Sequence, residues 1–441
     1  MKKTCMKITL FAIVILIAMN LVSGFAQDWP QFLGPEKNST SPQKNMLRSW
    51  PETGPEVLWT VNVGIGYGGP VVKDGKVYLL DRDDKVGDNL RCFDLTSGKE
   101  LWNFAYDAPG TFPFPGSRSV PAVDGNYVYS CGPYGDLYCI DINTQKPVWH
   151  KNVWKDFGDE DIPMWAITQC PLVYGDLIIV ASQTSTTGVV GYDKLTGDVK
   201  WTTPALGPIG YVTPTVVKVG DESHIVMITA SGRRTETNGK AVGIEPLSGK
   251  VLWEYTNFQC QIPCTGAVDA GDSKVLLIGG YRAGAAMLKI EKNADGSYKV
   301  NELYKTEDFG THTLPPVLHN GYFYVQYGTN ERRDGLVCMS MDGEIMWKTE
   351  RDPDFDKGSM ILADGLILAT DGKETLYLIE PDPSGFRSIA SAKLLNQGGV
   401  DTSNRMTNFG GSTQNWAPTA LADSRLLIRD QSRMLCVRVA Q

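Results

Sequence analysis

Nine aromatic, cationic and polar side chains stand at comparable places along the chain, each shortly before a short apolar segment. Arg118 offers a planar fork that grips carboxylates, and Lys357 offers a point charge. Aromatic rings beside such groups are typical of a concave site for a planar or sugar-like ligand. Loops that merely cover a wet channel are the alternative explanation. The nine candidates for ligand binding are Tyr67, Arg118, Trp165, Gln169, Tyr211, Gln261, His312, Lys357 and Trp416.

The chain offers few groups for metal or acid–base chemistry. It has four His and neither a Cys-x-x-Cys motif nor a His cluster, so we predict no metal site and no catalytic residue. Two acidic loops, 81–88 and 156–161, place carboxylates at alternating positions, as some Ca²⁺ sites do. Neither loop has Gly and Glu at the places where an EF-hand needs them, and both are better explained as solvated hairpin tips.

Eight Cys follow the first 26 residues, and their places suggest packing more than chemistry. Cys260 and Cys264 are too close in sequence to form a disulfide in extended chain without a turn. Cys170 and Cys264 share another equivalent position, which we expect to lie just inside the central channel. Four others stand at the place where other repeats have Gly191 or Gly243, which predicts buried, unpaired thiols and tight packing between neighbouring repeats. These four are Cys92, Cys139, Cys338 and Cys436.

The elements that would hold these residues form a repeat. One module recurs: an apolar strand, a Gly turn, a second apolar strand, a third strand ending in an acidic residue, a turn and an aromatic residue. The aromatic anchors lie 43 to 52 residues apart, which is typical of propeller blades with four strands each. No stretch has a long helical period, so we predict an all-β fold. The anchors are Trp59, Trp102, Trp149, Trp201, Trp253, Tyr304 and Trp347.

The two ends of the repeat region complement each other. The last segments, beginning at Pro418, Arg425 and Met434, supply three strands of a blade. The segment 56–61 supplies a fourth strand with no blade before it. Joining the two would close the ring and leave no exposed sheet edge. We therefore predict an eight-bladed β-propeller, with seven blades as the alternative if the repeat at 360–390 is misread.

The N-terminal residues predict export. A basic start, a long apolar run and small residues before position 27 match a secretory signal peptide over 1–26, followed by an N-terminal extension over 27–55 and one propeller domain over 56–441. The alternative is an apolar run kept as an anchor. Removal of 1–26 changes the formal net charge from −8 to −11, which argues against nucleic acid as a partner. We expect a periplasmic or secreted protein that is not stably inserted in a membrane after cleavage.

The third strand ending in Asp, followed by Thr-Gly-x-x-x-Trp as at 196–201, resembles the repeat of the PQQ-repeat (quinoprotein alcohol dehydrogenase-like) propeller superfamily over roughly residues 56–440. The opening Asp28-Trp-Pro-Gln-Phe-Leu-Gly-Pro35 also resembles the start of secreted bacterial members that carry little besides the propeller. The resemblance implies one of two roles. Some relatives are dehydrogenases that hold pyrroloquinoline quinone (PQQ) and Ca²⁺ in the central funnel. Others are non-catalytic scaffolds, such as the propeller lipoprotein of the outer-membrane assembly machinery.

The residues favour the second role. The dehydrogenases carry two adjacent Cys and an Asp base in the funnel, whereas this chain has no adjacent Cys pair and no acidic residue among the nine candidates. We therefore expect a non-catalytic binding or assembly scaffold in the cell envelope, with no cofactor and with an envelope protein or a glycan as its partner. The alternative is a PQQ- and Ca²⁺-dependent alcohol or sugar dehydrogenase. A third hypothesis, glycan binding or cleavage, rests on Trp165, Trp416 and Tyr211.

Overall fold

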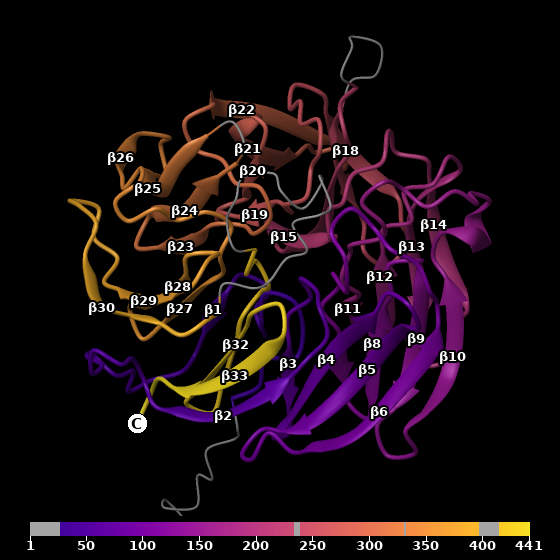
Figure 1. Cartoon of the computed structure of the whole chain (residues 1–441). Coiled ribbons are helices and arrows are strands. Elements are labelled where there is room, and N and C mark those ends of the chain that lie inside the picture. Colours follow the sequence, from indigo (N-terminus) through magenta and orange to yellow (C-terminus); the bar gives the residue numbers. More distant parts are fainter. Residues whose placement is uncertain (1–26, 233–238, 330–331, 397–413) are drawn as a thin grey trace, which may run out of the picture.

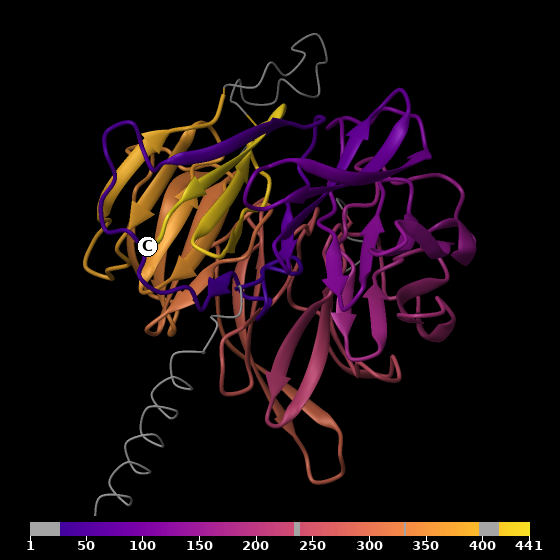
Figure 2. The same ribbon diagram turned by 90° about the horizontal axis from the view of Figure 1, so that it is seen from below.

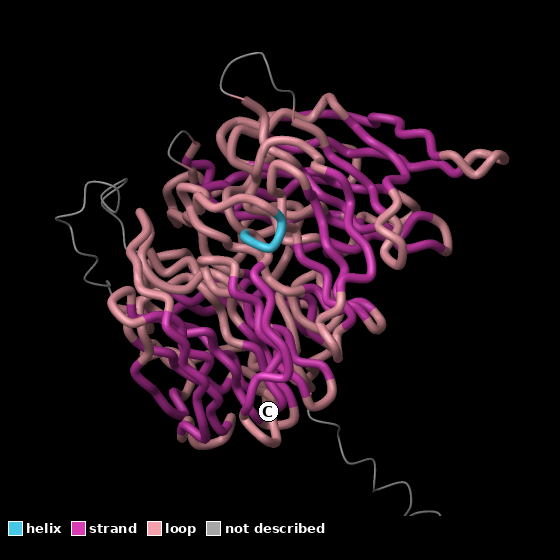
Figure 3. Tube along the Cα trace, turned by 90° about the vertical axis from the view of Figure 1, so that its right-hand side faces the viewer, coloured by secondary structure: helices cyan, strands magenta, loops and turns pink. Residues whose placement is uncertain are grey.

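The fold is an eight-bladed propeller built almost entirely of strands (Figure 1). The structure is a computed structural model, and it describes residues 27–232, 239–329, 332–396 and 414–441. The predicted signal peptide, 1–26, lies outside these residues. Within the described ranges the one helical element is the short 3₁₀ turn η1 (Lys155–Phe157), drawn in cyan in Figure 3. None of the described helices is long and apolar enough to span a membrane.

Blades 1 to 7 each contain four antiparallel strands that follow one another in sequence from the inside of the ring to the outside, and the short strand β1 (Thr40–Ser41) pairs in parallel with the innermost strand of blade 7. Blade 1 contains β3 (Val71–Lys73), β4 (Lys76–Asp83), β5 (Gly87–Asp94) and β6 (Glu100–Asp107). Blade 2 contains β7 (Ala122–Asp124), β8 (Tyr127–Cys131), β9 (Asp136–Asp141) and β10 (Lys146–Asn152). Blade 3 contains β11 (Leu172–Tyr174), β12 (Leu177–Val180), β13 (Thr187–Asp193) and β14 (Val199–Pro204). Blade 4 contains β15 (Thr215–Val219), β16 (Glu222–Ile228), β17 (Ala241–Ile244) and β18 (Val251–Tyr255).

The second half of the ring repeats this plan. Blade 5 contains β19 (Val268–Asp269), β20 (Lys274–Gly279), β21 (Gly284–Lys292) and β22 (Tyr298–Thr306), and its β21–β22 hairpin projects beyond the ring in Figure 2. Blade 6 contains β23 (Val317–His319), β24 (Tyr322–Gly328), β25 (Arg333–Ser340) and β26 (Ile345–Lys348). Blade 7 contains β27 (Met360–Ala363), β28 (Leu366–Thr370), β29 (Thr375–Ile379) and β30 (Ser388–Lys393).

The eighth blade closes the ring from both ends of the chain. Its inner strands are β31 (Ala420–Ala422), β32 (Arg425–Arg429) and β33 (Arg433–Arg438), and its outer strand is β2 (Val57–Asn62), which lies beside β33 in Figure 1. Trp59 on β2 stands opposite Cys436 on β33. The predicted closure and the count of eight blades are therefore confirmed, and no edge is left open at the seam.

The register explains why the repeat needs Trp and a small residue. In blades 3 and 4, Trp201 and Trp253 stand opposite Gly191 and Gly243. A Cβ atom on either glycine would collide with the indole ring of its own blade. The small residue therefore makes room for the Trp within one blade, which corrects our expectation that it serves packing between repeats. The thiols at this place are buried and unpaired, as predicted: Cys92, Cys139, Cys338 and Cys436.

The Trp ring also joins its blade to the next one. Trp59 Nε1 donates to the carbonyl of Leu95 in blade 1 at 2.8 Å, and Trp149 Nε1 donates to Lys194 in blade 3 at 3.1 Å. A Cβ at Gly98 would lie 2.7 Å from the Trp59 ring, and Gly98 has a φ of +70°. Glycine is required there by both the left-handed backbone and the close ring, so the turn and the blade interface depend on one residue.

The two acidic loops differ from each other. The loop at 156–161 is mostly exposed, as predicted. The prediction of a solvated tip at 81–88 is wrong, because Asp81 and Asp88 are 5% and 1% exposed. Both form ion pairs with arginines of the same blade, Asp88 with Arg82 and Asp81 with Arg91. A buried carboxylate is costly unless it is paired. The two arginines supply these pairs and so allow Asp81 and Asp88 to lie inside the sheet.

Candidate functional site

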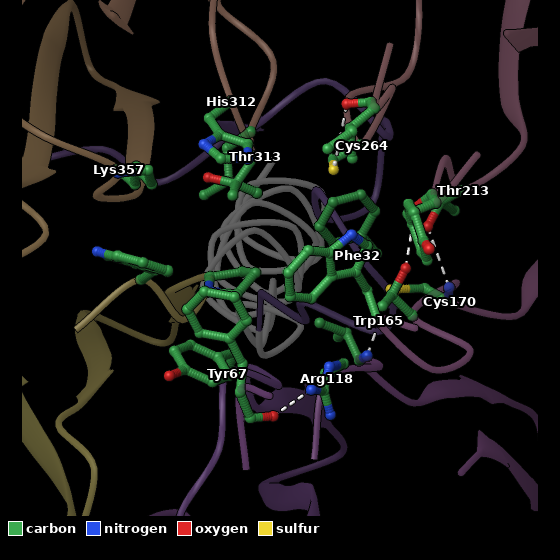
Figure 4. Close-up of a pocket in the computed structure, with 18 of the residues that line it drawn as sticks. Phe32, Tyr67, Arg118, Trp165, Cys170, Thr213, Cys264, His312, Thr313 and Lys357 are labelled. Carbon is green, nitrogen blue, oxygen red and sulfur yellow. Dashed lines mark hydrogen bonds between the residues drawn. The ribbon is translucent and has the colours of Figure 1, made fainter. Parts of the chain in front are cut away.

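The loops that lead into the innermost strands enclose a cavity of about 380 Å³ at one end of the central channel (Figure 4). Every blade contributes at least one lining residue, and the N-terminal extension contributes Phe32. Propeller geometry explains the convergence, since the innermost strands all begin around one axis.

Seven of the nine predicted residues line this cavity. They are Tyr67, Arg118, Trp165, Tyr211, His312, Lys357 and Trp416. Gln169 and Gln261 do not line it: Gln169 is buried outside the cavity and Gln261 is exposed. Thr168 and Cys170, on either side of Gln169, line it instead. Ile262 and Cys264, one and three positions after Gln261, also line it.

Four aromatic rings form a continuous wall of the cavity. The Tyr67 ring lies 5.6 Å from the Trp416 ring and 6.0 Å from the Phe114 ring, centre to centre. The Phe114 ring in turn lies 5.5 Å from the Trp165 ring. Tyr67 is oriented by its hydroxyl, which is 2.6 Å from Oε1 of Gln414. The wall presents flat apolar faces to anything that enters, which suits a planar ligand.

One cationic end of the cavity is the guanidinium of Arg118. It donates to the carbonyl oxygens of Gly116, at 3.0 Å, and of Phe114, and it lies 5.1 Å from the centre of the Phe112 ring. Burial lowers the pKa of Arg118 to about 10, so it is charged at neutral pH. Its hydrogen bonds go to main-chain carbonyls, which orient the fork and leave its positive charge in place.

A buried ion-pair network holds the loop that carries Phe114 and Arg118. Arg82, whose side chain is 0% exposed, donates to Asp88 at 2.9 Å and to Asp84 at 2.8 Å. It also donates to the carbonyls of Ala108 and Gly110, at 2.8 Å each. The loop between β6 and β7 is therefore fastened at its start to the centre of blade 1.

The other cationic end is formed by Lys357 and two neighbours. Lys357 Nζ lies 2.8 Å from Asp356 Oδ1 and 4.6 Å from the centre of the Trp416 ring. Burial and the charge of Lys357 lower the pKa of His312 to about 3, so this imidazole is neutral at physiological pH. Within the described chain, buried Trp416 Nε1 and His312 Nδ1 have no hydrogen-bond partner. Such groups are costly to bury alone and are suited to a ligand that supplies the partner.

Two thiols line the cavity from different blades, as their equivalent places predicted. Burial raises the pKa of Cys170 to about 11 and raises the pKa of Cys264 as well, so both stay protonated at neutral pH. Cys170 Sγ accepts a hydrogen bond from the Val120 amide at 3.3 Å. Both thiols therefore act as apolar wall and not as nucleophiles.

Three aromatic residues of the lining were not predicted from the sequence: Phe32, Phe114 and Tyr281. Phe114 lies in the loop between β6 and β7, and Tyr281 lies in the turn between β20 and β21, places that the repeat does not define. Phe32 lies in the opening motif, residues 28–35. The sequence identifies this motif but does not show where it lies relative to the blades. An alignment on strand starts finds residues within the repeat and misses those outside it.

The residues fit only part of the cofactor set of a PQQ-dependent dehydrogenase. Ca²⁺ is held by carboxylate and carbonyl oxygens, yet no Asp or Glu of the described ranges lines the cavity. The nearby Asp356 is paired with Lys357. Among the described residues, no three His, Cys, Asp or Glu side chains lie together as a group that could hold a metal ion. The aromatic wall and the two cations suit a planar anion, whereas the lining does not suit Ca²⁺.

Comparison with known proteins agrees with the repeat and the fold. The family model described as outer membrane protein assembly factor BamB matches residues 86–260. No match was found among curated proteins. Many solved structures share the fold. A quinohemoprotein alcohol dehydrogenase from Comamonas testosteroni superposes with a TM-score of 0.62 at 13% identity, covering 93% of this chain and 80% of that chain.

Two further structures represent both kinds of relative. BamB from Moraxella catarrhalis superposes with a TM-score of 0.57 at 12% identity, covering 87% of this chain and 99% of that chain. A europium-containing methanol dehydrogenase superposes with a TM-score of 0.56 at 12% identity, covering 91% of this chain and 89% of that chain. At such identities the likeness concerns the fold alone. The chain is thus an eight-bladed propeller similar to the PQQ-repeat propellers, both BamB and the quinone-dependent dehydrogenases, as the repeat predicted.

Proposed function

We propose that this chain is an exported, non-catalytic binding propeller whose central cavity takes a planar, anionic small molecule. The observation that carries the proposal is the composition of the lining: among the described residues, Arg118 and Lys357 are its only charged groups, and aromatic rings separate them. Guanidinium and ammonium groups bind carboxylate or sulfonate, and flat rings stack on a planar body.

The polar groups of the cavity support a ligand with acceptor groups at both ends. Arg118 donates to main-chain carbonyls, so these hydrogen bonds orient its positive charge without compensating it. Beside Lys357, the indole N–H of Trp416 has no acceptor among the described residues, and a ligand would supply one. A ligand held in this way is gripped at its edges and stacked on its faces, which is binding without a base or a nucleophile.

A role as an assembly scaffold in the cell envelope is the second candidate. It is favoured by the family-model match over 86–260 and by the predicted signal peptide. In that role a protein or glycan partner would contact the loops around the cavity, and the cavity itself would stay without a specific ligand. The two candidates differ in whether small planar anions bind saturably.

The alternative, a PQQ-dependent dehydrogenase, makes a different demand. It needs Ca²⁺ in the funnel and a carboxylate base close to the substrate. In the part of the chain that the structure describes, the lining has no carboxylate, and burial holds the pKa of His312 far below its usual value. We therefore derive no redox step for these residues.

The test is isothermal titration of the mature protein with two planar anions, naphthalene-2,6-dicarboxylate and pyrroloquinoline quinone, each with and without Ca²⁺. We expect saturable binding of at least one probe without Ca²⁺, and a loss of about tenfold or more in R118Q, because a charge-assisted hydrogen bond is removed. The uncharged naphthalene-2,6-dimethanol controls for the aromatic body alone.

Three other outcomes would contradict the proposal. Binding of the quinone only with Ca²⁺, together with dye reduction by an alcohol or a sugar, would support the dehydrogenase. No binding of either anion would favour the scaffold. Equal binding of the diol and the dicarboxylate would show that the cations do not recognise charge.

A further inference from the structure

The opening motif of the mature chain lies across the inner ends of two blades. Asp28 pairs with Lys73 of blade 1, with 2.7 Å between Oδ2 and Nζ. Trp29 exchanges both main-chain hydrogen bonds with Val72, at 2.9 and 2.8 Å. The Val123 amide of blade 2 then donates to the carbonyl of Pro30 at 2.8 Å. The segment is therefore fixed to the innermost strands directly before it reaches Phe32.

Phe32 separates the central cavity from a second, smaller space. Beyond the ring lies a void of about 20 Å³, which Phe32 also lines. Cys170 and Thr213 line the cavity, and Thr213 lines the void as well, together with Leu172 and Thr215, the first residues of β11 and β15. Phe32 thus lies where the two spaces adjoin, near the centre of the view in Figure 4.

The neighbours of Phe32 hold it firmly. Trp29 and Leu33 are 2% and 7% exposed, so the chain is anchored on both sides of the ring. Gly34 has a φ of +80°, and a Cβ there would lie 2.7 Å from the Trp29 ring. Glycine lets the chain turn tightly under the indole, which keeps the segment folded against the channel.

We propose that Phe32 is the floor of the binding cavity and sets how long a ligand it accepts. The opening motif would then serve as a stopper that leaves the cavity open at one end, so that ligand enters and leaves at the mouth. This inference rests on the proposed function, because it concerns the ligand that the same cavity takes.

The test is a ladder of rigid aromatic monocarboxylates titrated into the full mature protein: naphthalene-2-carboxylate, biphenyl-4-carboxylate and p-terphenyl-4-carboxylate. In wild type we expect the longest probe to bind at least about tenfold more weakly than the shortest. In Phe32→Ala we expect that ratio to fall by about tenfold or more, since removal of the ring joins the cavity to the void below. Phe32→Leu should show a smaller change in the same direction.

The matched control is Phe386→Ala, which removes another half-buried ring that packs in blade 7 and does not line the cavity. It should leave the ratio unchanged. If the ratio is unchanged in both Phe32 variants while the shortest probe still binds, Phe32 does not limit ligand length. The proposed binding function would not be affected by that result. Absence of binding by every probe to wild type would overturn both.

Discussion

The two cationic ends of the cavity are held in different ways. Arg118 is oriented by carbonyl groups of its own loop, and that loop is fastened by Arg82, which lies wholly inside blade 1. Lys357 is held locally, by the carboxylate of its neighbour Asp356 and by the Trp416 ring. One end therefore depends on a distant buried network and keeps its full charge, while the other is self-contained and partly neutralised.

This difference assigns unequal roles to the two ends. A guanidinium whose partners are carbonyls can still form a full ion pair with an anion. An ammonium that is already paired with a carboxylate attracts a second anion more weakly. Arg118 should therefore supply most of the attraction for an anionic ligand, at the cost of depending on blade 1. Lys357 should tune affinity with little effect on stability.

The largest effect is expected from breaking the support of the Arg118 end. Arg82→Met leaves Asp88 buried without its partner, and loss of one member of a buried ion pair typically costs about 3–5 kcal/mol. The free energy of unfolding, measured with urea, should fall by that amount. Affinity for naphthalene-2,6-dicarboxylate should fall as well, because the loop at 108–118 loses its fastening.

The control for this prediction is Arg91→Met. Arg91 lies on the next strand of the same blade and pairs with Asp81 and Glu100, but it is partly exposed and does not contact the loop. It should cost less than Arg82→Met, because Asp81 keeps its hydrogen bonds from the Gly64 and Arg82 amides, and it should leave probe affinity unchanged. Equal losses in the two variants would show that Arg82 has no special connection with the site.

A second prediction concerns the pH dependence of the same network. Burial raises the pKa of Asp88 to about 6, although Arg82 acts to lower it. The folded protein then holds this proton more tightly than the unfolded chain. Its stabilising contribution is complete below about pH 4 and is lost as the pH rises through about 6.

Asp88→Asn removes this titration and tests its sign. Between about pH 4 and about pH 7, its stability relative to wild type should improve by up to roughly 3 kcal/mol, which is the equivalent of two pKa units. Urea unfolding of both proteins across this range measures the difference. A constant difference between them would mean that Asp88 titrates as it does in the unfolded chain.

The sequence was sufficient to predict the blades and their closure because the repeat is local. Each module carries its own turn glycine, its small residue and its Trp, and neighbours in sequence are neighbours in space. The role of the small residue was misassigned, since only the register reveals that Gly191 lies under Trp201. The buried Asp88 was likewise taken for a surface residue, because its partner Arg82 could not be told from a solvated neighbour.

The candidate site was predictable where it follows the repeat. Counting from strand starts located seven lining residues, but an offset of one turned Gln169 away from the cavity, since successive residues of an extended chain face opposite sides. Phe32 could not be placed, because its contacts join the N-terminal segment to strands far along the chain. The pairing of β1 (Thr40–Ser41) with β27 is parallel and equally distant in sequence, and it was missed for the same reason.

The comparison of the two ends is tested directly by neutralising each cation. Arg118→Gln should weaken binding of naphthalene-2,6-dicarboxylate by about 1.5–3 kcal/mol, the usual worth of a hydrogen bond to a charged group. Lys357→Gln should cost about 1 kcal/mol or less, because its charge is shared with Asp356. Isothermal titration of both variants at one ionic strength gives the two values. A larger loss in Lys357→Gln would reverse the assignment of roles.

The smallest expected effect is a gain. Asp356→Asn keeps the shape of the side chain and removes the charge that competes for Lys357. The ammonium should then turn its full charge to the ligand, and affinity for the dicarboxylate should rise by about 0.5–1 kcal/mol, or two- to fivefold. The gain should vanish in Asp356→Asn/Lys357→Gln, because the two changes act through one contact. A gain that persists in the double variant would come from the lower negative charge around the mouth, and the pairing of Asp356 with Lys357 would then have no part in setting the affinity.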